Sequence, residues 1–135
     1  MIIKRLNYGG DIVSEIKKIC EKEGIKTGWF NAVGALKKLS CGFYDQKRKK
    51  YKKIHFRNGC EISSCMGNIS LLDGEIFVHA HINFADEKGA VRGGHLFESE
   101  IFAAEIAIFP GRKILKRKFD KETGLKLWRE QGKKL

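Results

Sequence analysis

The sequence lacks the features that mark several specialised classes of protein. No apolar run approaches the roughly 20 residues that a membrane-spanning helix needs, so we expect no membrane partner. Residues 1–5 run straight into strand-like sequence, without the zones of a secretory signal peptide. The four cysteines form neither a Cys-x-x-Cys pair nor a dense framework, which argues against zinc ribbons, knottins and thioredoxin-like motifs. These absences predict a soluble, cytoplasmic protein with reduced thiols.

Acidic residues are scarce relative to basic ones, and two segments account for the imbalance. The chain has 135 residues with 27 Lys and Arg against 16 Asp and Glu, a formal net charge of +11. Residues 47–57 carry 7 basic and no acidic side chains, and residues 111–135 carry 10 basic and 3 acidic ones. Residues 58–110 are acidic instead, with 8 acidic and 2 basic side chains.

The basic segments suggest DNA as a partner. A polyanion suits such runs, because each neutralised phosphate releases counterions. The alternative is that they are solvated hairpin and tail residues that keep the protein soluble. The candidate nucleic-acid contacts in the first run are Lys47, Arg48, Lys49, Lys50, Lys52 and Lys53.

The periodicity of apolar residues predicts an α+β fold. Residues 12–20 have helical spacing, with Asp11 placed to cap the start of a helix and Gly24 to cap its end. Strands are expected over residues 2–6, 25–33, 36–44, 51–56, 60–66, 75–84, 101–109 and 114–119, and residues 91–96 are expected to be irregular. Most connections are too short for helical crossovers, so we expect a mostly antiparallel sheet packed by one main helix. We expect a single domain over residues 1–135, with its core at about 3–119 and a basic tail at 120–135.

Three histidines in a short window form a candidate metal site. Strand residues 75–84 alternate, so that one face is apolar and the other carries His79 and His81, about 7 Å apart along the strand. His95 follows the flexible pair Gly93-Gly94. Three imidazoles with an open fourth position suit zinc, while iron, nickel and manganese stay open. The alternative is that each histidine is packed or hydrogen-bonded like any other.

Catalysis at such a site would also need a general acid or base. Glu98 and Glu105 are the candidate carboxylates, and Arg92 is a candidate for holding an anionic substrate. Each has a simpler interpretation as a residue on the protein surface or on an outward strand face.

Four short segments together resemble the prokaryotic PPC domain. They are Asn31–Leu36, Gly67–Ser70, His79-Ala80-His81 and Gly93–Leu96. This family, plants and prokaryotes conserved or DUF296, is often labelled as predicted DNA-binding with a PD1-like motif. The likeness extends over about Ile3 to Phe119.

The resemblance implies an α+β domain that assembles as a homotrimer, with His79, His81 and His95 at the family's three histidine positions. The fold is also similar to acetolactate decarboxylase, which holds zinc with a comparable set of histidines. The sequence has no Arg-Gly-Arg-Pro hook of the kind that accompanies the domain in plants. DNA binding would therefore fall to the basic segments. Aromatic residues independently favour subunit contact, because they give more aromatic surface than one thin sheet layer readily covers; they are Trp29, Phe77, Phe97, Phe102 and Phe109.

Two functional hypotheses follow. The first is a homotrimer that binds DNA without reading its sequence and carries a three-histidine metal site. The second is a metal-dependent enzyme, lyase- or hydrolase-like, that acts on a small anionic metabolite at that site. A third possibility is that the metal only stabilises an assembly platform.

Overall fold

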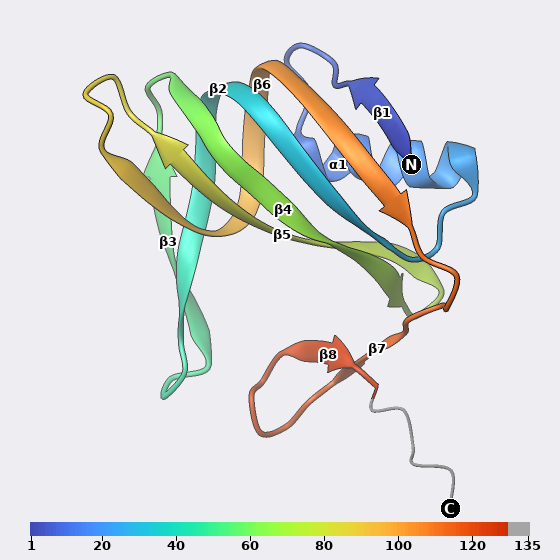
Figure 1. Cartoon of the computed structure of the whole chain (residues 1–135). Helices are drawn as coiled ribbons and strands as arrows, with labels where there is room; N and C mark the ends of the chain where they lie inside the picture. Colours follow the sequence, from blue (N-terminus) through green and yellow to red (C-terminus); the bar gives the residue numbers. More distant parts are fainter. Residues whose placement is uncertain (130–135) are drawn as a thin grey trace, which may run out of the picture.

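A curved antiparallel sheet dominates the computed structural model, which describes residues 1–129, and α1 lies on one side of the sheet (Figure 1). Residues 130–135 of the predicted basic tail lie outside the described part. The elements are β1 (Ile2–Arg5), α1 (Ile12–Glu23), β2 (Gly28–Asp45), β3 (Lys50–Phe56), β4 (Cys60–Leu72), β5 (Glu75–Ala85), β6 (Val91–Pro110), β7 (Arg117–Phe119) and β8 (Lys126–Trp128). The predicted α+β class, a mostly antiparallel sheet with one helix, is confirmed.

The large sheet closes on itself. Its strand order is β1-β6-β5-β4-β2-β3, and β6 pairs in addition with β2. The β2–β6 ladder runs from the Gly28–Pro110 pair to the Gly42–His95 pair, and all ladders between the named strands are antiparallel. Strands β2, β4, β5 and β6 therefore form a ring, and β1 and β3 extend it at two edges.

Two local predictions were wrong for the same physical reason. Residues 28–45 form the single strand β2, where two strands over 25–33 and 36–44 were expected, and residues 91–96 are the start of β6 instead of an irregular segment. Both segments contain glycine, which is typical of turns but here permits the close approach of two backbones within the sheet. A side chain at Gly34 would collide with the Ala103 carbonyl, and one at Gly93 with the Ile82 carbonyl. A bulge between Ala32 and Gly34 bends β2 without ending it.

Helix α1 is held at its start by one aspartate. The Asp11 carboxylate accepts a hydrogen bond from the Ser14 amide at 2.9 Å and another from the Ser99 amide at 2.8 Å. Gly24 adopts a left-handed conformation and ends the helix. The buried stripe of α1, Ile12, Ile16 and Cys20, packs into the core, and the helix contacts β5 and β6. Asp11 thus joins the helix to the strand that carries His95.

Replacing Asp11 by alanine is expected to destabilise the protein by about 1–2 kcal/mol, because the cap and the link to Ser99 are lost together. Urea unfolding followed by circular dichroism measures this change. Glu21→Ala, on an exposed position of the same helix, is the control and should change the stability by less than about 0.5 kcal/mol. Equal effects of the two substitutions would contradict the capping role.

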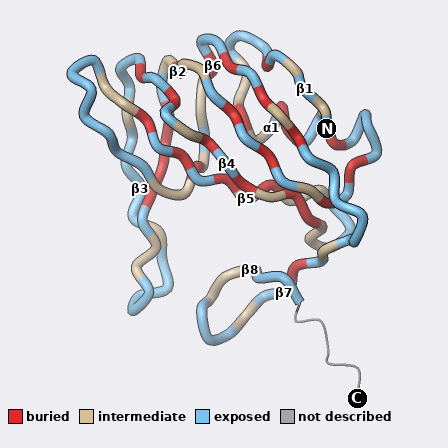
Figure 2. The backbone as a smooth tube through the Cα atoms, viewed as in Figure 1, coloured by how far each residue is buried: buried red, intermediate tan, exposed pale blue. Residues whose placement is uncertain are grey.

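Buried residues recur along β2, β4, β5 and β6 (Figure 2), and they form one core together with the buried stripe of α1. Phe30 and Phe84 are its largest fully buried side chains. No helix within residues 1–129 is long and apolar enough to cross a membrane.

Candidate metal centre and its cavity

The three predicted histidines lie together. Strand β5 supplies His79 and His81 on one face, and β6 supplies His95, which is the cross-strand partner of His81. The ring centroids are 5.0 Å apart for His79 and His81, 5.3 Å for His79 and His95, and 5.6 Å for His81 and His95. One ring nitrogen from each residue lies within 4.8 Å of the other two. This geometry offers three imidazole ligands to one ion.

Glycines let the neighbouring strands β4 and β2 approach the histidine strands β5 and β6 closely. A side chain at Gly67 of β4 would collide with the carbonyl of His79, and its Cβ would lie 2.8 Å from the Phe30 ring. A Cβ at Gly94 would lie 2.5 Å from the Gly42 carbonyl oxygen. Small residues are therefore required on both sides of the histidine strands.

The environment of the histidines suits metal binding. Burial, assisted by the neighbouring histidines, lowers the pKa of both His79 and His95 to about 4. Both rings are therefore neutral at pH 7, which is the form that coordinates metals. The Nδ1 atom of His95 is buried and has no hydrogen-bond partner among residues 1–129. A buried polar atom without a partner is rare unless a ligand satisfies it, so the residues fit a metal ion.

A cavity of about 290 Å³ lies beside the cluster. His79 and His95 line it together with these residues: Tyr51, Phe77, Arg117, Gly124, Leu125, Lys126 and Leu127. Tyr51 of β3 stacks against His95, with ring centroids 4.9 Å apart. The loop between β7 and β8 lies below the sheet, near the turn between β2 and β3 (Figure 1). Tyr44 donates a hydrogen bond to the Thr123 carbonyl there, and Lys49 donates one to the Lys121 carbonyl.

Arg117 is the buried cation of this cavity. Its guanidinium donates to Ser70 Oγ at 2.8 Å, to the Lys126 carbonyl at 2.7 Å and to Asn68 Oδ1 at 2.7 Å. It also lies over the Phe77 ring, 4.8 Å from the centroid. Burial lowers the pKa of Arg117, but an arginine stays charged at neutral pH.

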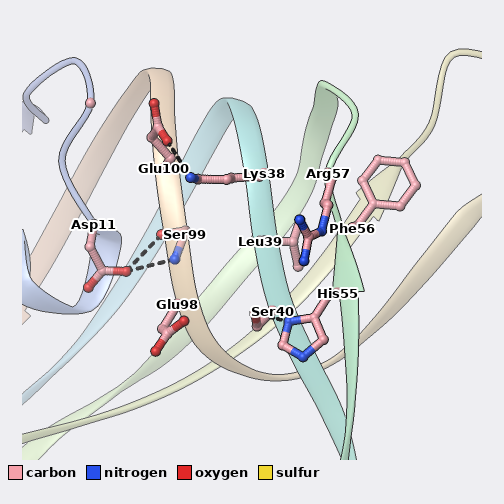
Figure 3. Close-up of a pocket in the computed structure, with 11 residues that line it drawn as sticks. Asp11, Lys38, Leu39, Ser40, His55, Phe56, Arg57, Glu98, Ser99 and Glu100 are labelled. Carbon is pink, nitrogen blue, oxygen red and sulfur yellow. Dashed lines mark hydrogen bonds and ion pairs between the residues drawn. The ribbon is translucent and has the colours of Figure 1, made fainter.

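The other predicted site residues do not line this cavity. Arg92 lies 3.5 Å from Asp86 in an ion pair at the start of β6. Glu105 is exposed further along β6, opposite Val33. Glu98 lines a separate cavity of about 450 Å³. Figure 3 shows Glu98 on one side of that cavity and His55 on the other, where His55 is hydrogen-bonded to Ser40 at 2.8 Å.

Sequence reasoning missed Tyr51 and Arg117. Tyr51 lies within the basic run, whose charged residues alone were interpreted as candidate contacts. Arg117 lies in a segment that alternates apolar and basic residues, and this alternation was the available signal for a cation on one strand face.

The six basic residues of the first run surround the turn between β2 and β3. All of them are exposed. Lys52 lies 3.7 Å from Asp45, and Lys53 lies over the Phe97 ring at 4.4 Å. Within the described residues, the side chains of Lys47, Arg48 and Lys50 make no hydrogen bond, ion pair or ring contact.

Several solved structures are similar to this chain over most of its length. A plant- and prokaryote-conserved protein from Pyrococcus horikoshii is 41% identical and covers 97% of this chain and 92% of its own, with a TM-score of 0.91. A metal-containing protein from Archaeoglobus fulgidus is 39% identical and covers 96% and 92%, also with a TM-score of 0.91. A protein from Bacteroides thetaiotaomicron, provisionally assigned as DNA-binding, is 28% identical and covers 93% and 89%, with a TM-score of 0.88.

The expected likeness of fold to acetolactate decarboxylase is confirmed. The enzyme from Bacillus subtilis is 15% identical, with a TM-score of 0.63 over 86% of this chain and 54% of that chain. This similarity shows a shared fold alone. No curated protein matches the sequence. Residues 1–110 match the Plants and Prokaryotes Conserved (PCC) domain, and the chain therefore belongs to this family, also abbreviated PPC.

Proposed function

We propose that this protein holds one divalent metal ion, zinc, at His79, His81 and His95 and uses it on a small anionic ligand in the adjoining cavity. The convergence of three imidazoles, one of them with a buried and unpartnered nitrogen, carries the proposal. The Archaeoglobus fulgidus relative is described as metal-containing, which supports it. Zinc matches an all-imidazole ligand set with an open fourth position.

The residues around the histidines suit chemistry on a small molecule. A bound zinc ion supplies a Lewis acid and lowers the pKa of bound water. Tyr51 contacts the His95 ring, and Tyr51 and Phe77 line the cavity of about 290 Å³ beside His79 and His95. This arrangement supports a lyase- or hydrolase-like reaction more than a purely structural ion, because a structural site is closed on all sides.

Metal analysis of untagged protein, purified without chelators, tests the proposal. We expect one zinc ion per chain, and a higher melting temperature after zinc is restored to metal-free protein. Protein that contains no metal, and whose melting temperature does not change when zinc is added, would exclude the metal centre.

We also propose that the chain assembles as a homotrimer. Large apolar side chains are exposed on the outer face of the sheet, including Trp29, Val33, Met66 and Phe109. Met66 is the cross-strand partner of His81, so this face adjoins the histidines. Exposed apolar patches of this kind mark subunit contacts. Native mass spectrometry should give three times the mass of the chain.

The four unpaired cysteines further support a cytoplasmic location.

A second candidate function is DNA binding without sequence preference. It rests on the exposed basic turn between β2 and β3 and on the relative provisionally assigned as DNA-binding. The one helix within residues 1–129, α1, has no Arg, Asn or Gln side chain with which to read bases. Contacts would therefore be to phosphates, which position a protein without specifying sequence.

Neutralising three cations of this turn is expected to weaken DNA binding. In the triple variant Lys47→Gln, Arg48→Gln, Lys50→Gln, the plot of log affinity against log salt should become shallower by about 2–3, since each phosphate contact contributes about 0.9. Fluorescence anisotropy with a duplex measures this slope, starting from about 50 mM salt.

The matched control removes three positive charges elsewhere, in the variant Lys17→Gln, Lys22→Gln, Lys26→Gln. These lysines lie on or just after α1 and are exposed. A slope that falls equally in both variants would reflect net charge alone. Absence of binding by the unaltered protein at low salt would exclude this function.

A further inference from the structure

Arg117 is a buried charge whose contacts are all neutral. Only 7% of the residue is exposed. Its three hydrogen-bond acceptors are a hydroxyl, a side-chain amide and a backbone carbonyl. Within residues 1–129 it makes no ion pair with an acidic residue. Buried charges in proteins are normally paired, because desolvation of a lone ion is costly.

The guanidinium also retains unused donors. It has five N–H bonds, of which three point at the acceptors above. Nη1 donates once, to the Lys126 carbonyl, and Nη2 donates once, to Asn68. Each terminal nitrogen therefore has one N–H without an acceptor in the described part of the chain. Two donors on neighbouring nitrogens match the two oxygens of a carboxylate.

The position of Arg117 connects these donors to the histidines. Arg117 lines the same cavity as His79 and His95. The remaining walls include the apolar side chains of Phe77, Leu125 and Leu127. The cavity thus combines a fixed cation, an apolar wall and a cluster of potential metal ligands.

The cation is held in place before any ligand binds. Ser70 and Asn68 of β4 fix the guanidinium, and the Phe77 and Trp128 rings lie close to it, with centroids 4.8 Å and 5.8 Å from its central carbon. A recognition group that is already ordered loses little conformational freedom on binding.

From these observations we infer that Arg117 is the anion-binding residue of the cavity and that its ligand is a small organic carboxylate. The carboxylate pairs with the guanidinium, the carbon chain lies against the apolar wall, and the remaining polar group faces the histidines. This inference rests on the proposed metal centre and specifies what that centre would act on. The planar fork of arginine favours a carboxylate, and the apolar wall favours an organic ligand over free phosphate.

Calorimetric titration of the full chain tests the inference. The probes are acetate, pyruvate, succinate and inorganic phosphate, each added to zinc-loaded and to metal-free protein. We expect at least one carboxylate to bind more tightly than phosphate. In Arg117→Met its dissociation constant should rise by about 10- to 100-fold, as for loss of a charged hydrogen bond, while the zinc content stays unchanged. Arg117→Lys should recover only part of the affinity.

Two controls separate recognition from folding. Lys118→Met removes a neighbouring exposed cation from the same strand and should bind as the unaltered protein does. Ser70→Ala keeps the charge but removes one of its anchors, and should weaken binding less than Arg117→Met does. The inference is overturned if no carboxylate binds, if phosphate binds most tightly, or if Arg117→Met binds as well as the unaltered protein. Absence of zinc from the unaltered protein would instead refute the metal centre.

Discussion

Replacing His81 by alanine is expected to give a folded protein that no longer retains its metal. His81 is exposed, so the loss of its side chain leaves the core intact. Removing one of three imidazoles should lower zinc affinity by about 100-fold or more, since even outer-shell partners of metal ligands are worth 10- to 100-fold. Inductively coupled plasma mass spectrometry of the purified variant measures its zinc content, and competition with a coloured chelator measures its zinc affinity.

His55→Ala is the matched control for this substitution. His55 is also exposed and lies on β3, where it is hydrogen-bonded to Ser40 and is not part of the cluster. This variant should keep a full complement of zinc. Retention of zinc by His81→Ala, or equal loss from both variants, would show that the three histidines do not form the metal site.

Replacing Gly67 by alanine is expected to destabilise the protein by about 3 kcal/mol and to weaken metal binding as well. The new methyl group would collide with the carbonyl of His79 and press on the Phe30 ring. Overpacking of this kind typically costs 1–3 kcal/mol, and here the collision is with backbone, which cannot rotate away. Relief requires β4 and β5 to separate at His79. The midpoint of urea unfolding and the zinc content report the two effects.

Gly59→Ala provides the comparison, because the nearest atom to its added methyl group is 3.8 Å away, at the Leu36 carbonyl. That substitution should leave stability within about 0.5 kcal/mol of the unaltered protein. If Gly67→Ala is equally harmless, β4 and β5 are not packed as closely as the structure indicates.

The histidine cluster was predictable because its geometry is local. Alternation along a strand places His79 and His81 on one face by necessity, and the flexible glycine pair before His95 lets the backbone bend close to that strand. The position of the helix was predictable for a similar reason, since both of its caps lie within a few residues of its ends. These predictions depended on periodicity and on short-range contacts.

The remainder of the cavity depended on contacts between distant segments. Tyr51 reaches His95 across 44 positions in the chain only because β3 pairs with β2 and β2 pairs with β6. Arg117 reaches the cavity because β4 offers Asn68 and Ser70 to its guanidinium. No local pattern encodes such pairings. The two candidate carboxylates, Glu98 and Glu105, lie elsewhere in the fold.

The place of β3 at the margin of the sheet gives its lysines a role that does not depend on DNA. One side of β3 has no neighbouring strand within the described part of the chain, and its unpaired backbone groups are a template on which another chain could add. Lysines along such an edge oppose this addition through repulsion and the cost of stripping their water. The residues concerned are Lys50, Lys52 and Lys53. Variants that neutralise them should therefore be checked for aggregation before any loss of binding is interpreted.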